Sequence, residues 1–191
     1  ALTSPNLQAQ DKKDTLLCAN EFGPNMLDIH GLGANRPSYG VAWNAYDRLL
    51  TYGRKKLPDG SAMYDFTKLE PELAERWKID ADGMGVTFYL RKDATFHDGS
   101  PVTAQDVKWS FDRALALGGF PTFQMKAGSL EDPAQFKVID VHTFYVKFIR
   151  KDKLSMPDLA VPVASIYNAT LAKKYAIEKD PWAAEWLKTN T

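Results

Sequence analysis

The chain has 191 residues, of which 45% are hydrophobic and 25% charged, a composition typical of a globular protein with a sizeable core. Lys plus Arg equals Asp plus Glu at 24 each, so the basic excess of a nucleic-acid-binding protein is absent. The single cysteine, Cys18, excludes an intramolecular disulfide and a cysteine-rich metal site, and no apolar run is long enough to cross a bilayer.

The first third of the chain predicts a strand, a loop and a helix. TLLCA (15–19) has the length of a short buried strand, and the Gly-Pro pair at 23–24 marks a loop. After a Gly-rich connection (30–40), apolar side chains at helical spacing predict a helix over 41–50. Residues 51–68 are polar without a period and predict a loop. The chain begins with Ala rather than Met, which favours removal of a signal peptide.

The next segment predicts a short helix and then a hairpin. PELAERW (71–77) starts with the proline that often opens a helix. An Asp-Gly turn within 80–85 joins two candidate strands, and in the second of them, VTFYL (86–90), apolar and polar residues alternate.

The stretch FHDGSPVTAQDV (96–107) has two interpretations. His97, Asp98 and the hydroxyl of Ser100 have the residue types of a catalytic cluster. Thr103 and Asp106, however, have the spacing of a capping box, and an apolar stripe follows them at helical spacing. We therefore interpret His97-Asp98-Gly99 as a turn that leads into a helix.

The last third predicts an aromatic loop, a hairpin and short helices. A Gly-Gly pair precedes FPTFQMKAGS (120–129), interpreted as a loop, and the hairpin joins 136–140 to 144–149. A second capping box is expected at 155–158. Asn168 is expected to cap one helix, and Asp180-Pro181 to open another.

Motifs for cofactors and metals are incomplete. The run Asp80 to Gly85 resembles the start of a calcium loop, but the fifth and twelfth positions hold Met84 and Arg91. Gly31 to Arg36 begins like a dinucleotide fingerprint without its third glycine. The three histidines lack metal-ligand spacing. We expect no metal and no cofactor.

Aromatic and polar residues gather in several loops, as in ligand sites that combine apolar walls with a few orienting groups. A purely structural role, covering a core, is the alternative for each of them. The candidate ligand-binding residues are Phe22, Asn25, Asn35, Arg36, Tyr39, Phe120 and Phe123.

The stretch PELAERWKIDADGMGVTFYLRKDATFHDGSPVTAQDVKWSFDRAL (71–115) resembles the signature region of the family 5 extracellular solute-binding proteins, the receptors of peptide and nickel ABC importers. TLLCANEFGPNMLDIHG (15–31) resembles the family's first strand and loop, with Ile29 in place of the usual proline. FKVIDVHTFYVKF (136–148) and MPDLAVPVASIY (156–167) extend the likeness over nearly the whole chain.

The resemblance implies a mixed α/β fold of the type II periplasmic-binding-protein class, which has two lobes. Family members are more than twice as long, so this chain is expected to be the N-terminal portion. Residues 1–50 and 165–191 would belong to lobe I, residues 51–164 to a subdomain inserted on the same side, and the second lobe to the remaining C-terminal part.

The resemblance also implies a periplasmic receptor, not an enzyme, that closes around a small molecule or peptide and delivers it to ABC permease subunits. A peptide or opine is favoured because Arg36 can pair with a carboxylate. Nickel-chelate, heme and oligosaccharide receptors are alternatives within the family. A secreted hydrolase that uses Asp93 and Asp98 is the alternative from another class.

Overall fold

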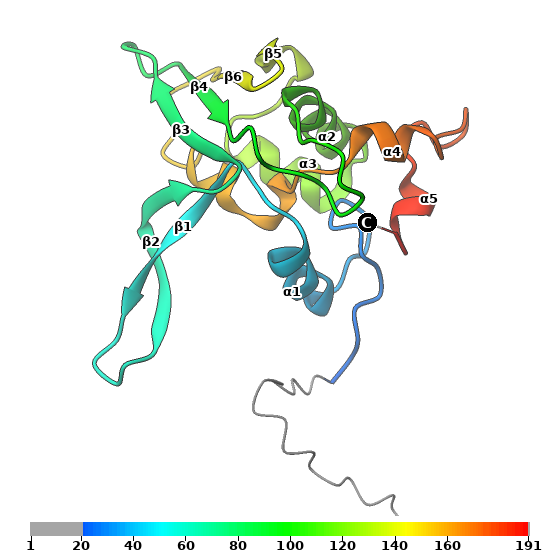
Figure 1. Cartoon of the computed structure of the whole chain (residues 1–191), viewed down its shortest axis with the longest axis horizontal. Helices are drawn as coiled ribbons and strands as arrows, with labels where there is room; N and C mark the ends of the chain where they lie inside the picture. Colours follow the sequence, from blue (N-terminus) through cyan, green and yellow to red (C-terminus); the bar gives the residue numbers. More distant parts are fainter. Residues whose placement is uncertain (1–20, 191) are drawn as a thin grey trace, which may run out of the picture.

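A four-stranded antiparallel sheet, with strand order β3-β4-β6-β5, forms the centre of the structure, a computed structural model that describes residues 21–190. A separate hairpin joins β1 to β2 (Figure 1). The elements in chain order are α1 (Arg36–Ala45), β1 (Leu50–Lys56), β2 (Ala62–Pro71), β3 (Ala74–Ile79), β4 (Gly85–Leu90), α2 (Ala104–Ala116), α3 (Gly119–Ala127), the 3-10 turn η1 (Pro133–Gln135), β5 (Phe136–Asp140), β6 (Thr143–Lys147), the 3-10 turns η2 (Pro157–Ala160) and η3 (Pro162–Ala164), α4 (Ala169–Lys173) and α5 (Ala184–Leu187).

Strand β4 follows the predicted alternation. Val86, Phe88 and Leu90 are buried, and the residues between them are half-buried. β4 pairs with β3 on one side and with β6 on the other. Both predicted hairpins, around 80–85 and around 141–142, are therefore confirmed.

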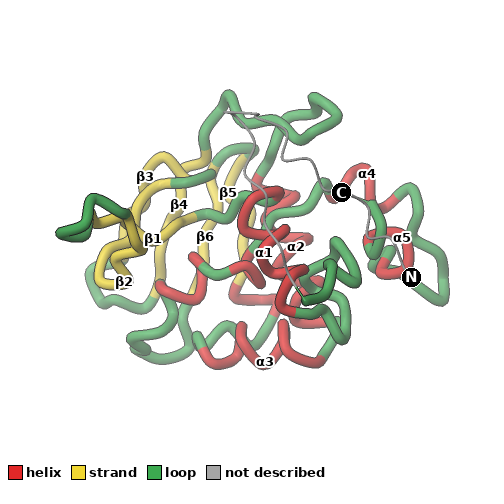
Figure 2. The backbone as a smooth tube through the Cα atoms, turned by 90° about the horizontal axis from the view of Figure 1, so that it is seen from below, coloured by secondary structure: helices red, strands yellow, loops and turns green. Residues whose placement is uncertain are grey.

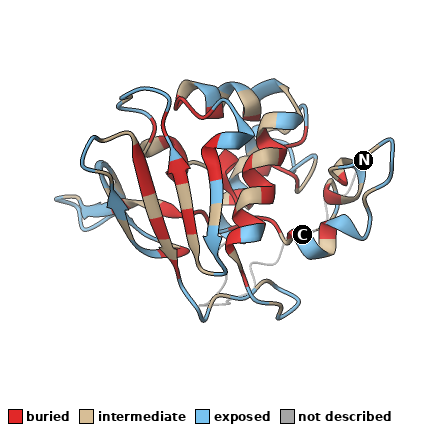
Figure 3. Cartoon of the chain, turned by 90° about the horizontal axis from the view of Figure 1, so that it is seen from above, coloured by how far each residue is buried: buried red, intermediate tan, exposed pale blue. Residues whose placement is uncertain are grey.

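The first hydrophobic core lies between this sheet and helix α2. Phe111 of α2 packs edge-on against Phe136 of β5 and Phe144 of β6, with ring centroids 5.2 and 5.7 Å apart. Figure 2 shows the strands on one side of the molecule and the helices on the other. Figure 3 shows that the buried residues of both layers face one another. The predicted apolar stripe of 107–115 therefore forms the helix side of this core.

A second, smaller core joins the beginning and the end of the described chain. It contains Ile29, Ala42, Tyr46, Trp109, Tyr167, Ala169, Ala172, Ala183 and Leu187. The first core draws its residues from 49–166, with only the side chain of Trp109 turned from α2 into the second. The chain thus passes from one core to the other near residue 48 and returns near 166.

The predicted helix over 41–50 is correct only in its first half. Helix α1 begins at Arg36, because the Asn35 side chain accepts a hydrogen bond from the Ser38 N–H (3.1 Å) and caps the first turn. It ends at Ala45, and Leu50 begins strand β1. The expectation of a Gly-rich connection up to residue 40 was wrong for this reason.

The predicted loop over 51–68 is a β-hairpin. Its turn contains Gly60 in the left-handed region (φ 84°), and the Leu57 N–H donates to the Ser61 carbonyl (2.8 Å). The strands lack an alternating pattern because most of their residues are exposed, and a register shift follows Tyr52. The hairpin projects from the rest of the chain (Figure 1).

The predicted helix over 71–77 is also wrong. Backbone N–H groups of Leu73 and Ala74 donate to the carbonyls of Arg48 (2.9 Å) and Leu49 (3.1 Å), which holds the segment extended. The Glu72 carboxylate accepts from the Arg48 N–H at 2.7 Å. These tertiary bonds outweigh the helix propensity of Leu, Ala and Glu.

Three predictions near the C-terminal end need correction. The aromatic segment is helix α3, which starts immediately after Gly118, rather than a loop. Residues 155–158 form no capping box, since Met156 precedes the short turn η2 without a side-chain cap. The last helix spans only Ala184–Leu187, although Asp180 accepts from the Ala184 and Glu185 N–H groups as a cap would. Asn168 caps α4 as predicted.

The predicted strand TLLCA lies outside the described residues. Within residues 21–190, no helix is long and apolar enough to cross a membrane.

Asp106 performs the predicted capping role at α2 and also contacts a second helix. One carboxylate oxygen accepts from the Thr103 N–H (2.9 Å) and hydroxyl (2.6 Å). The other accepts from the Ala169 N–H at the start of α4 (3.0 Å). This buried side chain therefore joins the two cores.

Asp106→Ala is expected to lower the free energy of unfolding by about 1–3 kcal/mol, because it leaves buried N–H groups without a partner. Urea unfolding followed by circular dichroism measures this. Gln105→Ala, an exposed change in the same turn, is the control and should stay close to the parent protein. An equal effect of both substitutions would contradict the role assigned to Asp106.

Candidate ligand-binding surface

Two of the predicted ligand-binding residues hold the N-terminal loop in shape. The Asn35 N–H donates to the Asn25 side-chain oxygen (3.0 Å), and the Asn35 amide donates to the Gly23 carbonyl (2.9 Å). The Asn25 amide donates to the Gly33 carbonyl (2.9 Å), and the Ser38 hydroxyl lies within hydrogen-bond distance of both asparagine side-chain oxygens (3.0 and 2.9 Å). Both asparagine amides are therefore engaged within the loop.

The structure brings Tyr39 of α1 and Phe120 of α3 together, with ring centroids 6.0 Å apart in an edge-on arrangement. Phe120 and Phe123 lie three residues apart on α3, so they are neighbours on the helix surface, and they are 50% and 69% exposed. Leu32, which is 65% exposed, lies against Gly119, where a Cβ atom would overlap it. We name Leu32, Tyr39, Phe120 and Phe123 the aromatic surface.

Phe22 and Arg36 are also exposed. Arg36 is the first residue of α1, and its guanidinium has no ion pair among the described residues. No aromatic contact joins Phe22 to the aromatic surface within residues 21–190. Leu32 was missed in the sequence because a lone leucine in a Gly-rich loop carries no signal of its own.

A buried ion pair joins the N-terminal loop to helix α2. The Arg113 guanidinium of α2 binds both oxygens of Asp28, with one distance of 2.8 Å, and both side chains are fully buried. Arg113 also donates to the Trp182 carbonyl (3.0 Å). The Tyr167 hydroxyl donates to Asp28 (3.0 Å) and accepts from the Ile29 N–H (3.0 Å). This network ties the N-terminal loop to α2 and to the C-terminal segments.

The network controls the ionisation of its members. Burial alone would raise the pKa of Asp28, but the hydrogen bond and charge of Arg113 outweigh it and hold that pKa below its ordinary value. Burial, followed by the charge of Arg113, lowers the pKa of His30 to about 4. His30 is therefore neutral at pH 7, and its Nε2–H donates to the Val163 carbonyl (2.7 Å). Burial raises the pKa of Tyr167 well above its ordinary value.

His97-Asp98-Gly99 forms the predicted turn. The Gly99 N–H donates to the Phe96 carbonyl (2.9 Å), and Gly99 adopts a φ of 83°. Asp98 accepts from the Ser100 N–H (2.9 Å) and hydroxyl (2.6 Å), which lower its pKa.

Both carboxylates of the hydrolase alternative are exposed and have lowered pKa values. The hydrogen bond from Arg91 lowers the pKa of Asp93, as the Ser100 bonds lower that of Asp98. Acid-base hydrolysis requires one carboxyl group with a raised pKa to act as the proton donor. Within residues 21–190, no three His, Cys, Asp or Glu side chains gather as a metal site would require.

The family model of the bacterial extracellular solute-binding proteins, family 5, matches residues 68–191. The chain belongs to this family. The sequence resemblance to family 5 is thereby confirmed.

Curated relatives of this family 5 chain carry names of peptide-binding proteins. The probable D,D-dipeptide-binding periplasmic protein DdpA of Escherichia coli K12 is 32% identical over 93% of this chain and 32% of its own length. Di/tripeptide-binding protein 4 of Pseudomonas aeruginosa is 36% identical over 84% of this chain and 31% of its own length. The chain thus spans about a third of the length of these relatives.

Solved structures of the same architecture confirm the fold class. The periplasmic binding protein AgaA in complex with agropinic acid, from A. tumefaciens R10, matches with a TM-score of 0.63 and 29% identity over 80% of this chain and 28% of its own. DppA from Helicobacter pylori in complex with the peptide STSA has the same TM-score at 20% identity, over 87% of this chain and 33% of its own. The latter likeness shows the fold alone.

Proposed function

We propose that this chain is the N-terminal portion of the solute-binding receptor of an ABC importer. The receptor captures a small solute between two lobes and delivers it to membrane permease subunits, and no bond is made or broken. Membership of family 5 carries the proposal. The periplasm is the expected location, and DdpA, which matches 93% of this chain, is named a periplasmic protein.

The two cores support the proposed division of the chain. Residues 1–50 and 165–191 form part of lobe I, and 51–164 form the inserted subdomain on the same side. Apart from Trp109, the second core draws on 29–46 and 167–187, and the first draws on 49–166. The second lobe belongs to the remaining C-terminal part of the receptor.

A peptide or an opine is the proposed solute. Relatives are named for dipeptides and di/tripeptides, and AgaA, at 29% identity, holds agropinic acid. Dipeptides, tripeptides and agropinic acid all carry a carboxylate, with which a guanidinium can pair. Arg36 has an exposed guanidinium and lies about one helical turn from Tyr39. The candidate contacts are Phe22, Asn25, Asn35, Arg36, Tyr39, Phe120 and Phe123. The two asparagines would act indirectly, by holding the N-terminal loop in shape.

Titration of the full-length receptor with di- and tripeptides, agropinic acid, heme, a nickel chelate and an oligosaccharide, followed by calorimetry, tests the proposal. Saturable binding of a peptide or opine is expected. Binding of heme, nickel chelate or sugar alone would select another branch of the family. Hydrolysis of the added solute would contradict the receptor function.

Phe120→Ala in the full-length receptor is expected to weaken solute binding at least about tenfold, since burying an aromatic side chain contributes roughly 1.5–3 kcal/mol. Phe66→Ala is the matched control, because Phe66 is another exposed phenylalanine (66%) and lies on the β1–β2 hairpin. Its affinity should stay within about twofold of the parent. Equal losses in both variants would exclude the aromatic surface as the contact.

A further inference from the structure

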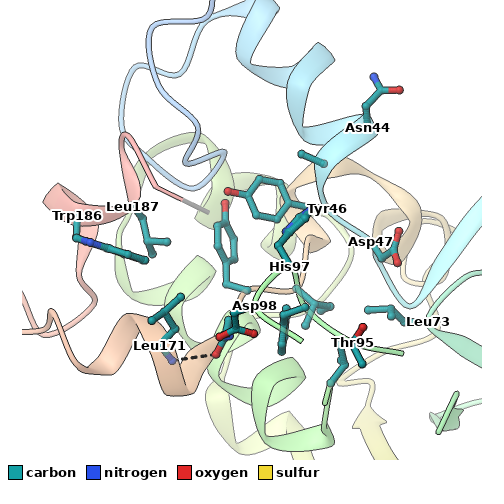
Figure 4. A pocket seen from close by; sticks show the side chains of 16 residues that line it. Asn44, Tyr46, Asp47, Leu73, Thr95, His97, Asp98, Leu171, Trp186 and Leu187 are labelled. Atoms are coloured by element: carbon teal, nitrogen blue, oxygen red, sulfur yellow. Dashed lines mark hydrogen bonds between the residues drawn. The ribbon is translucent and has the colours of Figure 1, made fainter. Parts of the chain in front are cut away.

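A cavity of about 230 Å³ lies where the two hydrophobic cores meet, apart from the aromatic surface (Figure 4). Its walls come from the end of α1, the 95–98 turn, the 166–168 segment and helices α4 and α5. No residue of the aromatic surface lines it. A site here would be separate from the proposed solute-binding cleft.

The cavity has an apolar part of useful size. Leu73, Val102, Ile166, Leu171 and Leu187 contribute aliphatic side chains to its walls. An apolar cavity of roughly 150 Å³ in another protein accepts benzene, so this one has room for a substituted ring or a branched chain. In Figure 4, Trp186 and Leu187 lie on the side opposite Asp47. Trp186 is stacked on Tyr175, with centroids 4.3 Å apart.

The charged groups in the walls are of one sign. Asp47 and Asp98 are the carboxylates of the lining, and no lysine or arginine is among the residues that form it. Asp98 is held by the Ser100 hydroxyl (2.6 Å) and by the Asn168 amide (3.0 Å). These bonds lower its pKa, with a smaller contribution from the charge of Lys174, so it is ionised at neutral pH.

Asp47 is an exposed carboxylate of this lining and has no partner among the described residues. No described residue donates a hydrogen bond to its side chain or forms an ion pair with it. Arg91 shares a neighbouring hollow with Asp47, but its ion pair is with Asp93 (3.4 Å). In addition, the Tyr46 hydroxyl is buried without a partner in the part of the chain that the structure describes, and Tyr46 forms part of the wall.

We propose that this cavity is a second binding site, which takes a small organic cation: a primary ammonium group on an aromatic or branched apolar body. The ammonium group pairs with Asp47, and the apolar body lies against Leu171, Leu187 and Trp186. The two aspartates disfavour a carboxylate ligand. A metal ion is not the occupant, because the described residues offer no group of three suitable ligands.

Benzylammonium is the probe, with uncharged benzyl alcohol and anionic benzoate as matched comparators. Two-dimensional NMR of the 191-residue chain follows the indole N–H of Trp186, identified by its loss in Trp186→Phe. Saturable shifts of this signal are expected with benzylammonium. Benzyl alcohol should bind at least about fivefold more weakly, since it lacks the ion pair, and benzoate should leave the signal in place.

Two variants separate the parts of the site. Asp47→Asn should reduce the affinity for benzylammonium to that for benzyl alcohol, while Asp59→Asn, in the exposed turn of the β1–β2 hairpin, should leave it unchanged. Leu171→Trp should fill the apolar part and weaken both ligands. Equal affinity for the three probes, or no effect of Asp47→Asn, would overturn the proposal. Solute capture by the full-length receptor is measured separately, so either proposal can fail alone.

Discussion

Asp28→Asn is expected to lower the free energy of unfolding by about 3–5 kcal/mol, because it leaves the fully buried Arg113 guanidinium without its counter-charge. The loss is large since the N-terminal loop, α2 and the C-terminal segment all meet at this pair. Urea unfolding at pH 7, followed by tryptophan fluorescence, measures it. Asp59→Asn, an exposed aspartate in a turn, is the control and should show little change.

The double variant Asp28→Asn/Arg113→Met distinguishes the energy of the pair from the cost of an unpaired charge. Removal of both charges is expected to restore about half or more of the lost stability, since replacing a buried ion pair with apolar groups is often nearly neutral. A double variant that is as unstable as the sum of both single changes would contradict this. So would a loss below about 1 kcal/mol for Asp28→Asn.

His30 is expected to make stability depend on pH between about 6.5 and 4. Its pKa in the folded chain is lowered from 6.5 to about 4, so the unfolded chain binds a proton in this range and the folded chain does not. Stability is therefore full above about pH 6.5, falls as the pH decreases, and levels off below about 4. A shift of this size corresponds to roughly 3 kcal/mol in total.

Urea unfolding at a series of pH values between 7 and 4 tests this expectation. His30→Gln keeps a donor for the Val163 carbonyl and should flatten the dependence. His97→Gln replaces an exposed histidine and should leave it unchanged. Asp28 acts in a lower range, because its stabilising contribution is lost only as the pH falls below the ordinary carboxyl pKa. A slope that survives in His30→Gln would contradict the assignment.

Segments whose structure depends on local patterns could be predicted from the sequence. The alternation in 86–90, the capping spacing of Thr103 and Asp106, and the Asp-Gly turn at 82–83 each act within a few residues. Burial on one face of a strand or helix then follows from the period of the pattern. The long motif 71–115 was sufficient to indicate family 5, and the family match confirms that interpretation.

Segments that depend on distant partners were predicted wrongly. PELAERW has the residues of a helix, but hydrogen bonds to Arg48 and Leu49 make its first part extended. The β1–β2 hairpin has no pattern because neither of its faces is fully covered. Gly118 and Gly119 predicted a loop. Both do take a positive φ, but Gly118 directly precedes α3 and Gly119 is its first residue.

For the sites, the sequence by itself determined the family and the residue types available, including the exposed aromatic residues and the turn at His97. Only the tertiary structure decided which of them come together: Tyr39 contacts Phe120, Asp28 pairs with Arg113, and Asp47 lines the same cavity as residues of α4 and α5. The partners in the first two pairs are 81 and 85 residues apart along the chain. Their contact is set by the packing of two hydrophobic cores against each other, and a local pattern carries no information about such packing.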